Sequence, residues 1–226
     1  MSKTDVKDKD IVVPGQTLAK DMGLVAGKNT YRHGEEIIAK TAGLVDIKGR
    51  VIKIIPLSGK YIPNKFDELI GVILEAGGTG WQVNIGAPYQ AYLPFSEYTK
   101  RFMDSRHVET VDLLAEGDLI QCKIVKYTKT KNLIVSTKHL QDKKLEGGIV
   151  IRVTPQKVPR IIGKQGSMIT LLREKTNTNI IAGPNGWVWI KSDKPENELK
   201  AAQAIEFINQ NAHKQGLTEK IEKLLK

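Results

Sequence analysis

The stretch Ile161-Ile162-Gly163-Lys164-Gln165-Gly166-Ser167-Met168-Ile169 predicts a tight turn between two helices. Its two glycines let the backbone come close to a phosphate, and the N-terminus of the second helix presents free N–H groups. A Gly-x-x-Gly clamp of this kind is typical of nucleic-acid binding. Ser167 is suited to capping the second helix, which we expect to run to about Asn177. The alternative is a helix-turn-helix link that needs glycine only for its geometry.

The same Gly-x-x-Gly spelling occurs at Gly77 to Gly80 and at Gly183 to Gly186. Only the copy at Gly163 follows a paired isoleucine and carries a lysine inside the clamp. For Gly183-Pro184-Asn185-Gly186 a hairpin turn is the better interpretation, because Pro-Asn-Gly supplies the backbone angles that such a turn needs. The pattern therefore predicts one clamp and one structural turn.

The elements predicted around the clamp follow the order strand, helix, helix, strand, strand, helix. Strands are expected at Gly148 to Thr154, Asn179 to Ala182 and Trp187 to Lys191, and a helix is expected to begin at Pro195. That helix carries an apolar face with a 3.6-residue period, formed by Ala201, Ile205, Ile208 and Ala212. A tail helix from Leu217 to Lys226 has its own apolar side, which must dock on this chain or on a partner; its members are Leu217, Ile221, Leu224 and Leu225.

A β unit precedes this part of the chain. Its five strands and a helical insertion at Val111 to Leu114 match the OB barrel, a fold that commonly binds oligonucleotides. The strands are expected near Leu69 to Glu75, Trp81 to Ile85, Gln90 to Leu93, Asp118 to Tyr127 and Asn132 to Ser136. Basic residues concentrate on this barrel and are predicted to bind RNA phosphates: Lys100, Arg101, Arg106, Lys123, Lys126, Lys129 and Lys131. For any one lysine, the alternative is a solvated charge.

The first part of the chain is predicted to be a small β domain. Short apolar strands at Ile11 to Val13, Glu36 to Ala39, Gly43 to Ile47 and Arg50 to Ile55 alternate with glycine turns. Tyr61-Ile62-Pro63-Asn64-Lys65 then acts as a tight joint. We expect three domains, at 1–63, 64–140 and 147–226, with a short charged linker between the last two, and a frayed tail from Ser2 to Asp10.

The composition favours a polyanionic partner. Lys and Arg number 35 against 25 Asp and Glu, which gives a net charge of +10. No apolar run is long enough to span a membrane, and no secretion signal is present, so we expect a cytoplasmic protein without membrane contact. The single cysteine, Cys122, lies in a strand pattern and is expected to be a buried structural thiol.

The sequence predicts no catalytic site, no metal site and no cofactor. His33, His107, His139 and His213 are scattered without metal-ligand spacing, and Cys122 has no recognisable protease partner. We therefore expect a binding protein and not an enzyme.

The element order around Gly163-Lys164-Gln165-Gly166 resembles a type I KH domain (βααββα). The barrel, with Gly71-Val72-Ile73 and Gly80-Trp81-Gln82-Val83, is similar to the S-one type of RNA-binding OB module. Upstream, Val13-Pro14-Gly15-Gln16 and the joint resemble the N-terminal domain of exosome cap proteins. The three modules in this order resemble the archaeal exosome RNA-binding cap subunits of the Rrp-four type, and the Gly-x-Asn-Gly turn at Gly183 is a signature of exosomal KH domains.

The resemblance implies a multidomain α+β fold and a non-catalytic, accessory role. Three such subunits would form a cap with other cap subunits on a ring of RNase PH-like subunits and thread RNA 3′ ends into it for 3′-to-5′ degradation. Its N-terminal domain would hold the ring, and its ligand would be single-stranded RNA with little sequence preference. The implied clamp residues are Arg160, Ile161, Ile162, Gly163, Lys164, Gln165 and Gly166.

The chain departs from this family at three positions. Gln82 and Pro94 stand where the generic barrel has a stacking aromatic and a histidine, which puts base stacking on that face in question. Phe66-Asp67 replaces the Gly-Asp that often precedes the first barrel strand, so the geometry of that turn is open. The alternative function is a transcription factor of the NusA kind, which has a barrel before its KH domains but usually carries a second KH copy.

Overall fold

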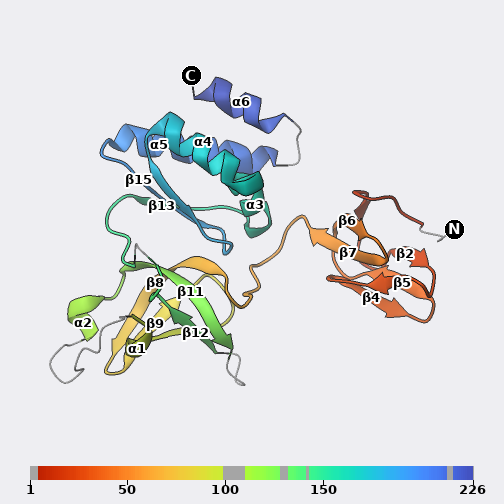
Figure 1. Ribbon diagram of the computed structural model, residues 1–226, viewed down its shortest axis with the longest axis horizontal. Coiled ribbons are helices and arrows are strands. Elements are labelled where there is room, and N and C mark those ends of the chain that lie inside the picture. The colour runs from red at the N-terminus through yellow and green to blue at the C-terminus, as the bar shows by residue number, and fades with distance from the viewer. Residues whose placement is uncertain (1–4, 99–109, 128–131, 141–142, 213–215, 226) are drawn as a thin grey trace. The chain divides into compact units, whose positions relative to one another are not determined.

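The computed structural model describes residues 5–98, 110–127, 132–140, 143–212 and 216–225 (Figure 1). The chain divides into two compact units, Met1–Gly59 and Lys60–Lys226, and each is described by itself. The predicted mixture of a β domain, a five-stranded barrel and an α+β domain with a tail helix is confirmed. In the described part of the chain, no helix is long and apolar enough to cross a lipid bilayer.

Short strands in the first unit form two sheets around one apolar core. The larger sheet has the order β1-β6-β7-β3 and the smaller has the order β2-β5-β4. The bounds are β1 (Ile11–Val12), β2 (Thr17–Lys20), β3 (Val25–Ala26), β4 (Thr30–His33), β5 (Glu36–Ala39), β6 (Gly43–Lys48) and β7 (Val51–Pro56). Inward side chains such as Leu18, Ile37 and Ile52 are fully buried, so the alternation of each strand decides which residues enter the core.

Two predictions for this unit are wrong. Strands β2, β3 and β4 were not expected, because they are short and β2 and β4 mix polar with apolar residues, which gives no apolar run to detect. Residues 5–10 are not frayed: Val6 is buried, the Asp5 N–H donates to Leu18 O, and the Lys9 N–H donates to Val45 O. These backbone bonds tie the segment to the sheets.

The second unit begins with the predicted barrel. Strands β8 (Glu68–Gly77), β9 (Gly80–Asn84), β10 (Ala91–Pro94), β11 (Leu119–Tyr127) and β12 (Leu133–Ser136) close in the order β10-β12-β11-β8-β9. The insertion holds two short helices, α2 (Thr110–Leu113) as expected and α1 (Phe95–Tyr98), which was not predicted. Fully buried Trp81 joins both helices to the core. Its indole N–H donates to the carbonyls of Thr110 and Leu114, at the two ends of α2, and its ring stacks on Phe95 of α1.

The C-terminal domain has the predicted order of elements. Its sheet runs β13-β15-β14, and the helices α3 and α4 flank the clamp. The bounds are β13 (Ile149–Arg152), α3 (Val158–Ile162), α4 (Ser167–Thr176), β14 (Asn179–Ala182), β15 (Trp187–Lys191), α5 (Pro195–Asn211) and α6 (Leu217–Leu224), with 3₁₀ turns at Pro155–Lys157 and Lys164–Gly166. The predicted apolar face of α5 is confirmed by its burial. The tail helix α6 docks on its own chain, with Leu217 and Ile221 in the same core.

The other face of this sheet packs on the barrel. Trp187 and Trp189 are buried with Ile70 of β8 and with Leu145. The segment expected as a linker is part of this contact: the Gln121 N–H donates to Lys143 O at 3.1 Å, and the Leu145 N–H donates to Leu119 O at 2.8 Å. The barrel and the C-terminal domain are therefore joined by a packed apolar layer.

Candidate nucleic-acid interface

The clamp is an irregular turn between the C-terminus of α3 and the N-terminus of α4. Three of its four residues have a positive φ, which is 77° at Gly163, 51° at Gln165 and 80° at Gly166. Two features require glycine at position 163. Its φ is positive, and a Cβ there would lie only 2.7 Å from the Met168 backbone nitrogen. The turn therefore keeps its path close to α4 and free of side-chain bulk.

The exposed side chains of the clamp are those of Arg160, Lys164 and Gln165, and Ile162 is half-buried. Within the described chain neither Arg160 nor Lys164 forms an ion pair with a carboxylate. Ile161 is fully buried in the core, so its prediction as an RNA-contacting residue is wrong. It holds α3 against the sheet and positions the clamp.

The prediction that Ser167 caps α4 is also wrong. Gly166 occupies the N-cap position, Ser167 is the first residue with helical angles, and no side chain caps this end. At the other end Asn177 caps the helix in a left-handed conformation, as expected to within a residue. An N-terminus without a side-chain acceptor, beside two exposed cations, suits an anion such as a phosphate.

The predicted barrel cations have different environments. Lys126 is exposed at the end of β11, whereas the Lys123 ammonium lies 2.9 Å from Glu68 Oε1, so its charge is neutralised. Lys123 is therefore a poor candidate for a phosphate contact. The remaining predicted cations lie outside the described residues: Lys100, Arg101, Arg106, Lys129 and Lys131.

The outer face of the barrel carries an aromatic residue that sequence reasoning missed. Tyr92 of β10 is paired directly with Gln82 of β9, so both side chains lie on the same face. The Tyr92 hydroxyl is 2.6 Å from Thr79 Oγ1. The sequence signal was the alternation along this strand: Ala91 and Leu93 point into the barrel and are buried, whereas Tyr92 between them points outward and is only half-buried.

The turn Gly183-Pro184-Asn185-Gly186 joins β14 to β15 as predicted, and it also attaches the C-terminal domain to the barrel. The Asn185 side-chain amide is buried and donates to Ile70 O at 2.7 Å and to Ile85 O at 3.0 Å. A Cβ on residue 183 would lie 2.3 Å from Asn185 Oδ1, which explains glycine there. This turn is occupied by the barrel and is not a second clamp.

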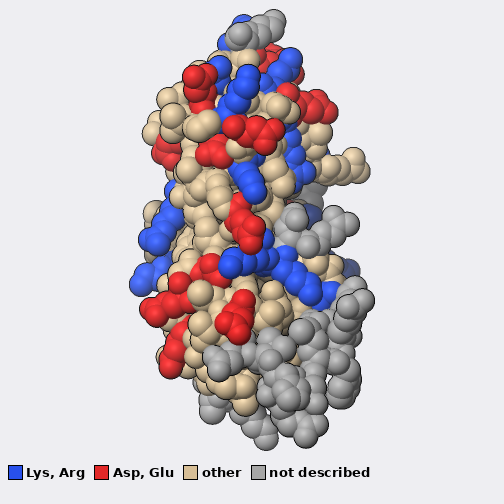
Figure 2. Space-filling view, turned by 90° about the vertical axis from the view of Figure 1, so that its left-hand side faces the viewer, with Lys and Arg blue, Asp and Glu red and all other residues tan. Residues whose placement is uncertain are grey.

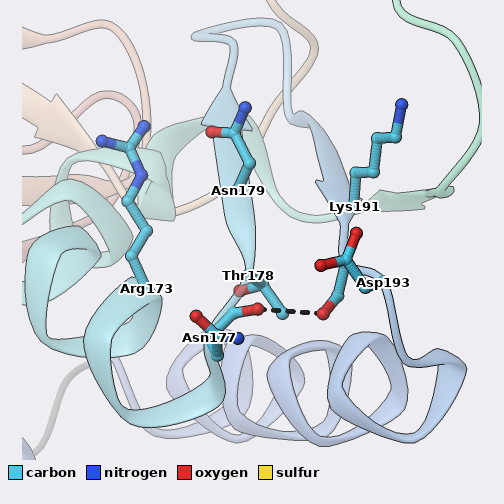
Figure 3. A pocket seen from close by; sticks show the side chains of 7 residues that line it. Arg173, Asn177, Thr178, Asn179, Lys191 and Asp193 are labelled. Carbon is cyan, nitrogen blue, oxygen red and sulfur yellow. Dashed lines mark hydrogen bonds between the residues drawn. The ribbon is translucent and has the colours of Figure 1, made fainter.

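A shallow hollow of about 390 Å³ lies at the other end of α4 (Figure 3). Two of its lining residues are joined by a hydrogen bond, in which Ser192 Oγ donates to Asn177 O at 2.9 Å. The Arg173 guanidinium points toward β14 and donates to Ile180 O at the free edge of the sheet. Because α4 has ten residues, this hollow is about 15 Å from the clamp and is a separate feature.

Figure 2 shows one face on which basic and acidic side chains are interspersed. The excess positive charge is thus not gathered into one patch there. Part of it is held in ion pairs, as between Lys144 Nζ and Asp118 Oδ2 at 2.7 Å. Burial alone would raise the pKa of Asp118, but hydrogen bonds from Lys144 and from the Ala115 N–H lower it overall.

The lone cysteine and the possible metal ligands can be placed in the described residues. Cys122 is fully buried, as predicted, and burial raises the pKa of its thiol. Among the parts of the chain that the structure describes, no group of three or more His, Cys, Asp or Glu side chains could hold a metal ion. The cationic clamp is the best-supported candidate site.

Comparisons with known proteins agree with this architecture. Residues 9–58 match the family described as the exosome RNA binding protein RRP4 N-terminal domain, and residues 148–196 match the KH domain. The chain is 38% identical to the exosome complex component Rrp4 of Pyrococcus furiosus over 227 residues, covering 100% of this chain and 86% of that protein. It is 39% identical to the Rrp4 component of Methanothermus fervidus over 220 residues, covering 97% and 96%.

A solved structure is also similar. A crystal structure of a protein assigned as an exosome complex RNA-binding protein superposes with a TM-score of 0.67 at 31% identity, covering 74% of this chain and 95% of that one. The similarity therefore extends over most of the fold and is not confined to the clamp.

Proposed function

The chain belongs to the Rrp4 family of exosome complex components, and from that premise we propose that it is a non-catalytic RNA-binding cap subunit. In this role it recruits RNA 3′ ends and threads them into a ring of RNase PH-like subunits for 3′-to-5′ degradation. One observation carries the proposal most directly: in a KH fold, exposed Lys164 lies inside a glycine turn and exposed Arg160 lies just before it, next to an uncapped helix N-terminus. The relatives named above are exosome components, which leaves the NusA-like alternative without support.

The clamp suits phosphates more than base edges. The α4 N-terminus has a partial positive charge, and the two cations add their full charge beside it. Contacts of this kind are independent of base identity, so binding should tolerate any sequence and weaken with salt. That property fits a subunit that must accept many RNA ends.

The division into functional domains follows the three predicted segments. Residues 1–63 would dock on the ring, residues 64–140 would bind RNA through the barrel, and residues 147–226 would bind RNA through the clamp. The protein would act in the cytoplasm with other cap subunits. The exposed side chain of Lys126 supports the RNA-binding role of the barrel, because its charge is available to a phosphate.

An apolar row on the first unit supports docking to a protein ring. Ile11, Leu44 and Ile55 are neighbours across β1, β6 and β7, and they lie on the face away from the core. Ile11 is 70% exposed and Ile55 is 48% exposed. Side chains of this kind in one row favour contact with another protein.

Charge reversal at the clamp tests the RNA-binding role. Lys164→Glu should weaken binding of a fluorescent single-stranded RNA about tenfold and should flatten the plot of log affinity against log salt by about 0.7. Lys175→Glu is the matched control, since it makes the same charge change in the last turn of α4. Equal effects of the two substitutions would show that general charge and not the clamp determines affinity.

Two further experiments test the rest of the role. The purified chain with labelled RNA, phosphate and magnesium should leave the RNA intact, and shortening of the RNA would contradict the non-catalytic assignment. Co-purification with RNase PH-like subunits should yield a stable complex. Ile11→Asp with Ile55→Asp should break that complex while RNA binding by the free chain stays unchanged.

A further inference from the structure

Phe66 is an exposed aromatic residue in a backbone conformation that suits glycine. Its φ is 73°, and its side chain is 61% exposed. A bulky side chain in the left-handed region is an outlier, because its Cβ crowds the following carbonyl. Glycine at this position would form the same turn without that strain.

The turn itself is fixed by hydrogen bonds that do not use the phenyl ring. The Phe66 N–H donates to Ile124 O at 2.8 Å, and the Ile124 N–H donates to Asp67 O at 2.9 Å. Asp67 Oδ2 accepts from the Tyr61 hydroxyl at 2.5 Å and from the Asn64 N–H at 3.1 Å. The phenyl ring adds little burial to this network, so the described fold gives no reason for an aromatic side chain here.

The surroundings of the ring are cationic. The Lys65 ammonium lies 4.8 Å from the centroid of the Phe66 ring. Lys126 is exposed two residues beyond the Ile124 carbonyl that accepts from Phe66. In the described chain neither lysine forms an ion pair with a carboxylate, in contrast to Lys123.

The same end of the barrel is held rigid. The hydroxyl of Tyr127, which follows Lys126, donates to Pro63 O three residues before Phe66. Both ends of the short loop that carries the ring are thus bound to β11. An exposed ring on a tethered loop, with one lysine at the ring and a second exposed lysine on the strand to which the loop is bonded, is an arrangement with which proteins stack unpaired bases and hold the adjoining phosphates.

We propose that Phe66 is a stacking residue for an unpaired base of single-stranded RNA, with Lys65 and Lys126 contacting the flanking phosphates. This site rests on the proposed RNA-binding function and adds to it a base contact on the barrel. Protein docking is the competing explanation, because Ile62 nearby is 66% exposed. The cations at Lys65 and Lys126 favour RNA, since they would interrupt an apolar protein contact.

Phe66→Gly in the full chain separates binding from folding. Glycine accepts the left-handed backbone, so the midpoint of chemical denaturation should stay equal or rise. Affinity for a fluorescent oligoadenylate should fall between about fivefold and a hundredfold, the range expected for loss of one stacked base. Phe66→Trp should retain affinity, whereas Phe66→Leu should lose it, because only an aromatic ring stacks.

Leu74→Ala is the matched control, since Leu74 is a large apolar side chain that is 50% exposed on the barrel strand β8 and has no aromatic ring. RNA containing 2-aminopurine, whose fluorescence falls on stacking, should be quenched by the wild type and less by Phe66→Gly. Unchanged affinity in Phe66→Gly, with Lys164→Glu still weakened, would overturn the stacking site and leave the proposed function standing. Loss of ring-subunit binding with RNA affinity intact would assign Phe66 to a protein contact and overturn the proposal. A wild-type chain that does not bind RNA would overturn both.

Discussion

Replacing Asn185 by alanine should weaken the attachment of the C-terminal domain to the barrel. The substitution removes two side-chain hydrogen bonds, at 2.7 Å to Ile70 O and at 3.0 Å to Ile85 O, from a residue that is only 4% exposed. A hydrogen bond contributes about 1 kcal/mol net, and a buried carbonyl left without a donor costs about 1–3 kcal/mol. We therefore expect a loss of roughly 2–4 kcal/mol in the free energy of unfolding.

The assay is urea denaturation of the full chain, followed by tryptophan fluorescence. Trp187 and Trp189 report the layer between the domains, and Trp81 reports the barrel core. In Asn185→Ala the midpoint should fall, and hydrogen exchange should increase in the peptide spanning β14 and β15.

Asn179→Ala is the matched control, because Asn179 is an exposed asparagine on β14, six residues before Asn185. It should change stability by less than about 0.5 kcal/mol. If Asn185→Ala behaves like this control, the amide does not hold the two domains together and the reasoning from the buried bonds is refuted.

Three further outcomes follow from the structure. Gly163→Ala should weaken RNA binding and lower stability, since its Cβ would lie 2.7 Å from the Met168 nitrogen at a positive φ; unaltered binding in a filter assay would contradict the required path of the clamp. Asp118→Asn should destabilise the chain at neutral pH, and because the folded pKa of this carboxyl is lowered, the difference from wild type in thermal melts should shrink as pH falls below about 4 and through that lowered pKa. Cys122 should not react with a thiol reagent in the native chain and should react once urea unfolds it, because its thiol is buried and its pKa is raised; rapid native labelling would argue against that burial.

Local patterns in the sequence were sufficient for most of the fold. The period of Ala201, Ile205 and Ile208 gave the buried face of α5, and the alternating apolar strands gave the barrel. Strands β2, β3 and β4 of the first unit escaped detection, because β3 has only two residues and the four-residue strands β2 and β4 mix polar with apolar residues, so none carries a clear periodic signal. Their pairing depends on neighbours distant in the chain.

The candidate site was predicted in part. The Gly-x-x-Gly motif at Gly163 located the clamp. It could not show that Ile161 is buried or that Ser167 does not cap α4, because both depend on how α3 and α4 pack. Likewise, Lys123 counted as a free cation until β11 paired with β8 and placed it beside Glu68. Charges in a sequence have no partners until strands far apart are aligned.

The sequence by itself determined which modules this protein has, because glycine turns and apolar periods are local properties of the chain. Only the tertiary structure decided what several of those residues do. The residues next to Asn185 in the sequence predict that it lies in a turn. That it also joins two domains follows only from the fold, which places the carbonyls of Ile70 and Ile85 within hydrogen-bond distance of its side chain. Phe66 is a departure from a family pattern in the sequence; its exposure and its left-handed backbone arise only when the turn closes onto β11.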